Sequence, residues 1–394
     1  MVRVVVTGIG LVSALGNSLK DSWQNLLCLK TGIKLHQPFP KLGKIPLGLI
    51  NQQPSDLSTL TQMVVYSALQ NAELVASLPD CAVVIGSSRS YQASWEKFAQ
   101  QMYGQDTNAE LLNLENWLDT LPLMNAIAVA RQIGSCGPVL APMAACATGI
   151  WAISQAAMLI QSGQCQRAIA GAVEAPVTPL TICGFQQMGA LAKTGAYPFD
   201  LHREGLVLGE GGAVFVLESA ESAKQRQINP ENIYGEILGF GLTADAFHGI
   251  QPESEGKSAI AAIKQCLERS NLTPADIDYI HAHGTATILN DRIESKIIQS
   301  LFPPKVAISS TKGSTGHTLG ASGALGVAFS LLSLKHKILP PAVGLQQPEF
   351  DLNFVTTVRN TEIQKMLCLS FGFGGQNAAI ALGSSNSIYC IELI

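Results

Sequence analysis

Residues 138–161 read PVLAPMAACATGIWAISQAAMLIQ, and this stretch indicates the class of fold. It begins with a short apolar run suited to a strand, passes through small residues around Cys146 and continues with the apolar spacing of a helix. The wider stretch Gln132–Gln166 contains no charged residue, but Gly and Pro interrupt it, whereas a membrane span needs about 20 predominantly apolar residues. We therefore predict a buried strand followed by a buried helix, and no membrane span.

The same alternation recurs along the chain. Short β-branched runs lie at residues 2–7, 82–86, 138–141, 167–173, 212–217, 279–283, 306–309 and 367–370. Helical spacing occurs at residues 21–28, 60–75, 150–161, 258–270 and 321–334. This alternation predicts an α/β protein with a largely parallel sheet. A second series of elements starts near residue 229, so we divide the chain into halves at 1–228 and 229–394.

The composition describes a packed globule of enzyme size. Of the 394 residues 47% are hydrophobic and 14% charged, whereas typical domains carry about 25% charged residues. The formal charge of −4 lacks the basic excess of nucleic-acid binding, so we expect no such partner. The 9 cysteines show no close pairing and no secretory leader is evident, which favours reduced thiols and a cytoplasmic location. The high apolar content favours a dimer.

Cys146 is the candidate nucleophile. It precedes a predicted helix, where unpaired backbone N–H groups and the positive end of the helix dipole favour thiolate over thiol. The alternative is a small apolar core residue, which is the common role of a cysteine. The motifs that follow in the sequence favour the nucleophile.

Three further segments carry candidate reactive groups. His281-Ala-His283 ends a predicted strand, but no third ligand of suitable spacing makes it a convincing zinc site. Residues 310–317 read STKGSTGH and contain Lys312. Residues 370–377 read SFGFGGQN, a glycine-rich segment that could present backbone N–H groups to an oxyanion or form a plain β-turn. A thiol, histidines and a lysine at strand ends together suit nucleophilic acyl transfer.

These segments together resemble the β-ketoacyl synthase family of the thiolase-like superfamily, most closely its elongating Cys-His-His type. The resemblance covers nearly the whole chain in family order, through VVVTGIGLVSALGNS, AACATG, PFDLHREGLVLGEGGAVFVLE, HGTATILND, STKGSTGH and SFGFGGQNAAIAL. It implies two similar halves stacked as a five-layer αβαβα sandwich, usually a homodimer. It also implies decarboxylative Claisen condensation of a malonyl carrier thioester with an enzyme-bound acyl group, in fatty-acid or polyketide-like synthesis, without metal or organic cofactor.

The resemblance assigns the catalytic roles residue by residue. Cys146 matches the nucleophile that accepts the acyl group, and its backbone N–H matches one oxyanion donor. His283 and His317 match the histidines that assist decarboxylation and stabilise the enolate. Lys312 matches the active-site lysine, and Glu294 matches the carboxylate that pairs with it.

The resemblance also assigns residues to the substrate. Thr285 and Thr287 match the hydroxyls that hold the phosphopantetheine arm, and Asp291 matches a neighbouring acid that supports this site. Phe373 matches the gate of the acyl pocket and the second oxyanion donor, and Phe185 matches a pocket-side phenylalanine. Departures at Ala144, at Gln376 and in the tail 384–394 leave the chain length of the substrate and the choice of partner open.

Two alternatives stay open at this point. The first is a non-catalytic, chain-length-factor-like subunit that shapes the pocket of a ketosynthase partner in a heterodimer, although such subunits usually lack the nucleophilic cysteine. The second is a thiolase or an initiating condensing enzyme, which lacks the STKGSTGH pattern.

The expected partner is an acyl carrier protein. Such carriers are acidic, and relatives commonly meet them with Lys and Arg near the pocket entrance. Residues 45–88, however, contain no Lys or Arg. Either docking electrostatics are weak in this protein, or basic residues elsewhere, such as Lys97, Arg203 or Lys257, compensate.

Overall fold

The computed structural model describes residues 2–103 and 117–385. Most of the tail 384–394 therefore lies outside the described residues. None of the helices in the described ranges combines the length and apolar character that crossing a membrane requires.

The main strands form two sets with the same internal order. The first set contains β1 (Val4–Ser13), β4 (Cys81–Gly86), β5 (Val139–Leu140), β6 (Arg167–Glu174) and β7 (Gly211–Ser219). The second contains β8 (Gly235–Ala244), β9 (Tyr279–His281), β10 (Ala307–Ser309), β13 (Lys365–Gly372) and β14 (Gln376–Gly383). The orders are β5-β4-β6-β7-β1 and β10-β9-β13-β14-β8, and β1 pairs with β8 where the sets meet. The predicted similarity of the two halves is confirmed, whereas the boundary at 228/229 stays a prediction.

The strand directions correct the expectation of a largely parallel sheet. In the first set, β4 runs parallel to β5 and β6, and in the second β9 runs parallel to β10 and β13. The pairs β6–β7, β7–β1, β1–β8, β8–β14 and β14–β13 are all antiparallel. Helical crossovers give parallel pairs only among the outer three strands of each set, β5-β4-β6 and β10-β9-β13. The strand that comes last in the sequence of each set, β7 or β14, runs antiparallel to the strand before it.

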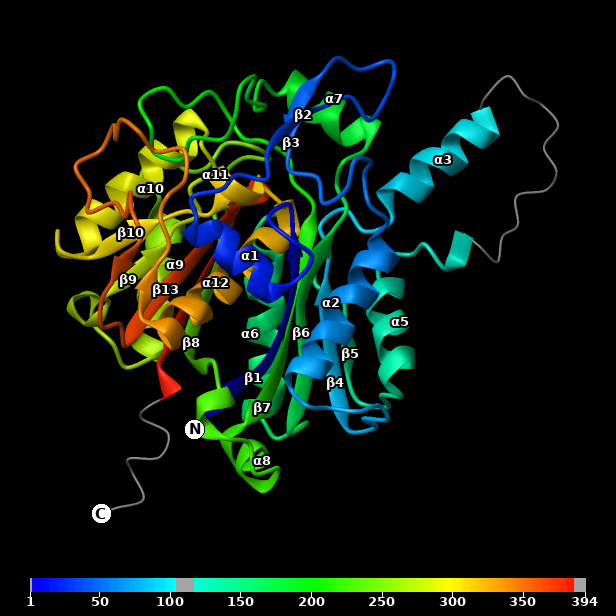
Figure 1. Cartoon of the computed structure of the whole chain (residues 1–394), viewed down its shortest axis with the longest axis vertical. Coiled ribbons are helices and arrows are strands. Elements are labelled where there is room, and N and C mark those ends of the chain that lie inside the picture. The colour runs from blue at the N-terminus through cyan, green and yellow to red at the C-terminus, as the bar shows by residue number, and fades with distance from the viewer. Residues whose placement is uncertain (1, 104–116, 386–394) are drawn as a thin grey trace.

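Helices cover both sets and fill the space between them (Figure 1). The helices α6 (Thr148–Gln161) and α12 (Ser322–His336) pack on each other in the middle. On the outer face of the first set lie α2 (Leu57–Asn71) and α5 (Met124–Ile133), and on that of the second lie α9 (Lys257–Arg269) and α10 (Ile288–Leu301). Helix, sheet, helix, sheet and helix make the predicted five layers.

The remaining elements surround these layers. The short helices are α1 (Leu19–Leu27), α3 (Gln92–Tyr103), α7 (Pro179–Gln187), α8 (Ala220–Gln225) and α11 (Lys312–Thr315). The 3-10 turns are η1 (Pro230–Asn232), η2 (Pro274–Asp276), η3 (Leu319–Ala321) and η4 (Phe373–Gly375). The strand pairs β2 (Lys34–His36) with β3 (Ile45–Leu47), and β11 (Ile338–Leu339) with β12 (Arg359–Asn360), form two small ladders.

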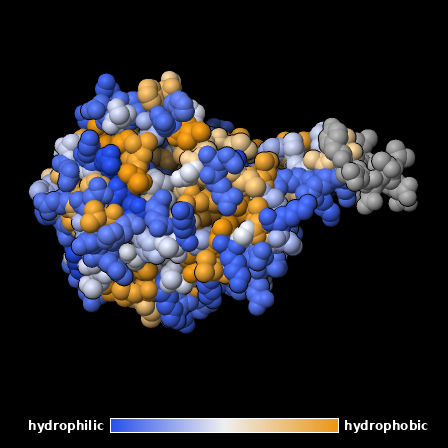
Figure 2. All heavy atoms as spheres, turned by 90° about the horizontal axis from the view of Figure 1, so that it is seen from above, coloured by the Kyte–Doolittle hydropathy of each residue, from blue (hydrophilic) through white to orange (hydrophobic). Residues whose placement is uncertain are grey.

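The uncharged stretch around Cys146 is a sheet edge followed by a central helix. A Cβ on Gly149 would lie 2.5 Å from the backbone nitrogen of Ala324, so the close packing of α6 on α12 requires glycine there. The helix is buried as predicted. The strand is not, because β5 is the edge strand of its set and its Leu140 is 38% exposed. Apolar side chains also reach the surface elsewhere, and the face in Figure 2 shows them mixed with hydrophilic ones around a hollow.

Candidate active site

A sharp turn between β5 and α6 fixes Cys146. Ala145 has a φ of 46°, in the left-handed region that non-glycine residues rarely adopt. The Thr148 hydroxyl stabilises this turn, since it donates to the Ala145 carbonyl at 2.7 Å and accepts the Ala144 N–H at 2.8 Å. Cys146 is thereby held just before α6 and is only 7% exposed.

The burial of Cys146 corrects the expectation that its position favours the thiolate. Burial raises the pKa of the thiol to about 11, although Lys312, the backbone N–H of Phe373 and Arg89 each lower it. Desolvation therefore outweighs the favourable charges around the sulfur. Cys146 is a protonated thiol at neutral pH and must lose its proton when it attacks.

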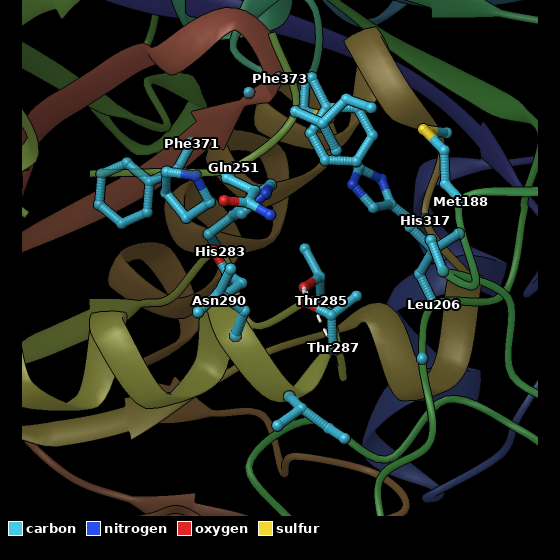
Figure 3. Close-up of a pocket in the computed structure, with 18 of the residues that line it drawn as sticks. Met188, Leu206, Gln251, His283, Thr285, Thr287, Asn290, His317, Phe371 and Phe373 are labelled. Carbon is cyan, nitrogen blue, oxygen red and sulfur yellow. Dashed lines mark hydrogen bonds between the residues drawn. The ribbon is translucent and has the colours of Figure 1, made fainter. Parts of the chain in front are cut away.

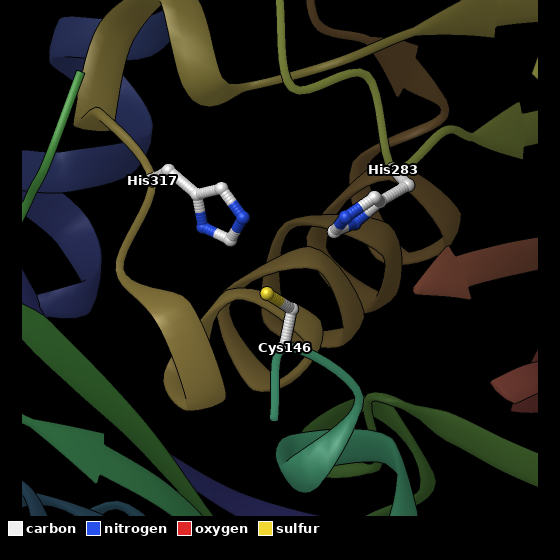
Figure 4. Close-up of side chains that lie close together, drawn as sticks. All are labelled: Cys146, His283 and His317. Carbon is white, nitrogen blue, oxygen red and sulfur yellow. The ribbon is translucent and has the colours of Figure 1, made fainter. Parts of the chain in front are cut away.

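His283 and His317 converge on this thiol from the second half of the chain. The Cys146 Sγ atom and one nitrogen of each ring lie within 4.8 Å of one another. The two ring centroids are 5.4 Å apart with planes at 85°, and Figure 4 shows both rings directed toward the sulfur. The predicted strand at 279–283 ends at His281, so His283 lies in the loop after β9, and His317 follows α11.

Hydrogen bonds determine which ring nitrogen carries the proton. Nδ1 of His317 accepts the Leu319 N–H at 3.1 Å, and Nδ1 of His283 lies 3.4 Å from the Nζ donor of Lys312. A neutral imidazole that accepts at Nδ1 carries its proton on Nε2. Burial lowers the pKa of both histidines well below 6.5, and the Lys312 charge lowers it further. Both rings are therefore neutral at pH 7 and have an Nε2–H group to donate.

Cys146, His283 and His317 also have the residue types and the spacing of a metal site. Among the described residues they are the one cluster of His, Cys, Asp or Glu whose ligand atoms are close enough. The positive charge of Lys312 beside His283 opposes a second cation, and hydrogen-bond donors already face both Nδ1 atoms. The arrangement is better suited to proton transfer and hydrogen bonding than to metal ligation.

Glu294 acts on Lys312 through its charge rather than through a close ion pair: burial lowers the pKa of Lys312, and the Glu294 charge is the largest that opposes this fall. Lys312 is buried and donates from Nζ to the carbonyl oxygen of His283. The Glu294 carboxylate accepts the backbone N–H groups of His283 at 2.6 Å and Gly284 at 2.7 Å. Its oxygens are thus occupied by the loop backbone, and no ion pair joins it to Lys312 within the described part of the chain. Burial raises the pKa of Glu294, and the Lys312 charge opposes that rise.

Asp291 supports the site from behind rather than from within it. Its carboxylate accepts the backbone N–H groups of Thr285 at 3.0 Å and Phe199 at 2.8 Å. Arg203 approaches the same carboxylate at 3.8 Å and donates to the Ile288 carbonyl at 3.2 Å. Asp291 is buried and is absent from the cavity wall, so it orders the loop that carries Thr285 and does not contact the substrate space.

A cavity of about 350 Å³ leads to the thiol and the two histidines. Thr285 and Thr287 line it and share a hydrogen bond of 2.9 Å between their hydroxyls (Figure 3). Phe185 and Phe373 also line it, and their rings stack with centroids 5.9 Å apart. The residues predicted to contact the substrate, Asp291 excepted, therefore share one cavity with Cys146, His283 and His317.

The glycine-rich segment is the turn of the β13–β14 hairpin, and it lies against Cys146. A Cβ on Gly372 would stand 2.9 Å from the backbone nitrogen of Cys146, so only glycine permits this approach. The Ser370 hydroxyl donates to the Cys146 carbonyl at 2.8 Å, which ties the two loops together. The segment is thus a turn that also brings the Phe373 N–H to the sulfur.

His281 does not share the site of His283. Its Nε2 lies 3.1 Å from the Thr311 hydroxyl, and its Nδ1 lies 3.8 Å from the sulfur of Cys368. The two histidines do not both belong to the predicted strand, because β9 ends at His281. His281 packs behind the residue before Lys312 and is absent from the cavity wall.

Glu174 is a buried acid near the site that the sequence interpretation overlooked. It ends β6, accepts the Ser88 N–H through Oε1, and leaves Oε2 without a partner among the described residues. Burial raises its pKa to about 7. The signal in the sequence was a single acidic residue at the end of the otherwise apolar run AIAGAVE.

The two halves each match a known domain. Residues 51–223 match the family model "Beta-ketoacyl synthase, N-terminal domain", and residues 234–346 match "Beta-ketoacyl synthase, C-terminal domain". This chain belongs to the β-ketoacyl synthase family. The resemblance inferred from the motifs is thereby confirmed.

Individual relatives are similar to this chain over nearly its whole length and nearly their own. The 3-oxoacyl-[acyl-carrier-protein] synthase 2 of Coxiella burnetii is 33% identical over 418 residues, covering 96% of this chain and 98% of the relative. A structure of a type II PKS acyl-carrier protein in complex with its ketosynthase, bound to the hexaketide, matches with a TM-score of 0.91 and 28% identity, covering 97% and 99% of the two chains. A ketosynthase in complex with its chain length factor from Xenorhabdus doucetiae matches with a TM-score of 0.80 and 27% identity, covering 97% and 98%.

Proposed function

We propose that this β-ketoacyl synthase elongates acyl chains by decarboxylative Claisen condensation of a malonyl carrier thioester with an acyl group on Cys146. The observation that carries the proposal is the convergence of the thiol with two neutral imidazoles at one cavity. The name of the Coxiella burnetii relative supports the same reaction. No metal or organic cofactor takes part in it.

The first step transfers the acyl group to the enzyme. The Cys146 sulfur attacks the carbonyl of an acyl carrier thioester, the bond to the carrier sulfur breaks, and the thiol proton leaves with the carrier thiol. The negative oxygen of the tetrahedral intermediate accepts hydrogen bonds from the backbone N–H groups of Cys146 and Phe373. The contact of the Gly372 loop with Cys146 supports this arrangement, because it brings the two backbone groups together.

The second step forms the new carbon–carbon bond. The malonyl thioester loses CO2, and the electron pair of the broken bond moves onto the thioester oxygen as an enolate. The Nε2–H groups of His283 and His317 donate to this oxygen as the charge develops. The enolate carbon then attacks the acyl carbonyl on Cys146, and the sulfur leaves and takes up one proton.

The cavity holds the carrier arm and the acyl chain. The hydroxyls of Thr285 and Thr287 bind the polar phosphopantetheine arm, and the stacked rings of Phe185 and Phe373 border the apolar acyl space. Phe373 can gate that space because it belongs to a turn with glycines on both sides.

The partners follow from the same proposal. An acyl carrier protein delivers both thioesters to the cytoplasmic enzyme. A second copy of the chain pairs along the edge strand β5, where Leu140 is exposed, as is Met143 in the segment that follows it. The alternative is a heterodimer with a ketosynthase-like subunit, as in the Xenorhabdus doucetiae complex.

Intact-mass analysis with acyl carriers of graded chain length tests the function. The expected result is a covalent acyl adduct on Cys146, followed by a β-ketoacyl carrier two carbons longer when malonyl carrier is added. A protein that forms no adduct with any carrier, alone or with a partner, would instead be a pocket-shaping subunit.

A further inference from the structure

Exposed apolar side chains border the cavity that leads to Cys146. Met188, Ile250, Ile288 and Leu289 all line this cavity, and they are 38%, 43%, 53% and 42% exposed. We call these four residues the apolar rim. A single exposed apolar side chain is ordinary, but a group around one opening indicates a surface that something covers.

The rim is assembled from three distant parts of the chain. Met188 follows α7, Ile250 lies between β8 and α9, and Ile288 and Leu289 form the first turn of α10. Arg203 donates to the carbonyls of Thr287 at 3.4 Å and Ile288 at 3.2 Å, so the start of α10 is held rigidly. The fold therefore presents the rim as a preformed surface.

The charges around the opening do not favour an acidic partner. Of the described residues that line the cavity, the only ones that carry a formal charge are Glu204 and Asp245. Arg203, one of the basic residues expected to compensate, is buried and committed to the α10 loop. Arg89 is an exposed cation outside that wall, and its guanidinium lies 5.9 Å from the ring centroid of the wall residue Phe185. Lys193 and Arg292 are exposed cations that are close in sequence to wall residues and also lie outside the wall.

The depth of the nucleophile determines what occupies the rim. Cys146 is 7% exposed at the inner end of the cavity, so a thioester reaches it only on a flexible arm. The body that carries the arm stays outside, where the apolar rim surrounds the arm. The docking surface is thus continuous with the substrate cavity.

We infer that the apolar rim is the docking surface for the acyl carrier protein, and that the carrier binds it mainly through an apolar face. This inference rests on the proposed function and specifies its partner. Burial of apolar area acts at short range and changes little with salt, whereas charge steering raises the association rate and weakens as salt increases. Carrier recognition in this protein should therefore depend on rim side chains more than on surface lysines and arginines.

The test compares a rim variant with matched controls. The double variant Ile288→Ser with Leu289→Ser removes two rim side chains, and Val75→Ser removes an exposed apolar side chain outside the cavity wall. Lys193→Ala with Arg292→Ala removes two exposed cations that are close in sequence to wall residues. Acylation of Cys146 is followed with hexanoyl carrier protein and with hexanoyl-N-acetylcysteamine, a small thioester that needs no docking.

The expected result is a selective loss with the carrier. The rim variant should lose about tenfold or more in kcat/KM with hexanoyl carrier but less than about threefold with the small thioester. The Val75 variant and the cation variant should have a kcat/KM with the carrier within about twofold of that of the unchanged protein. The kcat/KM of the unchanged protein should also change by less than about twofold between low and physiological salt. Equal losses with both thioesters, or a steep fall with salt that the cation variant abolishes, would overturn the inference.

This design separates the docking inference from the proposed function. If the small thioester acylates Cys146 and the rim variant is unaffected with the carrier, the function stands and the docking surface is wrong. If the unchanged protein is acylated by neither substrate, the proposed function itself fails.

Discussion

The Nζ atom of Lys312 lies 3.4 Å from Nδ1 of His283 and donates to the carbonyl oxygen of the same residue. One buried side chain thus fixes both the backbone and the ring of His283. Because a donor faces Nδ1, the neutral ring keeps its proton on Nε2, and His283 lines the cavity. The charge of Lys312 also lowers the pKa of His283, in addition to the effect of burial.

Replacing Lys312 by Met should slow malonyl decarboxylation by about a hundredfold at pH 8, comparable to the loss of one oxyanion donor. Without the donor at Nδ1, His283 can place its proton there and face the enolate with a bare Nε2. Removing the positive charge also raises the pKa of His283, so the imidazolium, which has protons on both nitrogens, forms more readily as pH falls. The defect should therefore shrink between pH 8 and pH 6, as measured by CO2 release.

Lys296→Met serves as the control for that variant, because Lys296 is an exposed lysine on α10. It should decarboxylate like the unchanged protein at every pH. A Lys312→Met defect of constant size across this range would argue that the lysine acts only as a structural support.

Cys146→Ala should abolish acyl-enzyme formation and lower condensation by at least about a thousandfold, because Cys146 is the thiol that the described part of the chain places beside the two histidines. Cys146→Gln should retain decarboxylation, since the histidines and both backbone N–H donors stay in place. Cys183→Ala, which removes an exposed thiol on α7, is the matched control. Mass spectrometry after acyl loading decides the assignment, and an adduct on another cysteine of Cys146→Ala would disprove it.

Much of this site could be predicted because the reactive groups follow strand ends in short motifs. The local sequence is enough to predict a strand followed by Cys146 and a helix. It is also enough to predict the STKGSTGH turn that carries Lys312 and His317. The pKa values and the hydrogen-bond partners of these residues, however, depend on contacts between distant segments. The pKa of Cys146 is one case, since burial raises it, and Lys312 and the Phe373 N–H, which both come from the other half of the chain, lower it.

The errors share that cause. Asp291 was expected at the substrate, but its carboxylate binds the backbone N–H groups of Phe199 and Thr285. Glu294 acts on Lys312 through its charge, as expected of a pair, but its oxygens bind the backbone N–H groups of residues 283 and 284. Such partners are invisible in a linear sequence. The antiparallel centre of the sheet was missed because strand direction depends on how the chain returns, which the sequence pattern does not show. The strands β1, β6 and β7 were predicted, yet β7 pairs antiparallel to both of its neighbours, and β8 and β14 were not recognised as strands.

Replacing Gly372 by Ala should lower kcat for condensation by about tenfold to a hundredfold while leaving the fold intact. The added Cβ would stand 2.9 Å from the Cys146 nitrogen and 3.0 Å from the Ala144 carbonyl, so the two loops must separate. That separation moves the Phe373 N–H away from the reacting carbonyl. In the control Gly184→Ala, the new Cβ meets nothing within 4 Å, and steady-state kinetics should remain unchanged. Normal turnover by Gly372→Ala would remove Phe373 from the oxyanion hole.

Replacing Glu174 by Gln should change the pH dependence of stability. Burial raises the pKa of Glu174 to about 7 from its ordinary 4.5, so the folded protein holds a proton that the unfolded chain releases. Stability from this group is therefore greatest below pH 4.5 and is lost as pH rises toward 7, by roughly 3 kcal/mol in total. Gln resembles the protonated acid and cannot ionise, so it avoids this loss.

The melting temperature of Glu174→Gln should therefore gain on that of the unchanged protein as pH rises from 5 to 8. The amide oxygen of Gln can still accept the Ser88 N–H, so the substitution preserves the contact that Oε1 makes. Glu268→Gln changes an exposed carboxylate on α9 and should shift little relative to the unchanged protein over the same range. Parallel melting curves for Glu174→Gln and the unchanged protein at both pH values would mean that Glu174 stays ionised, and that a group near Ser88 compensates its buried charge.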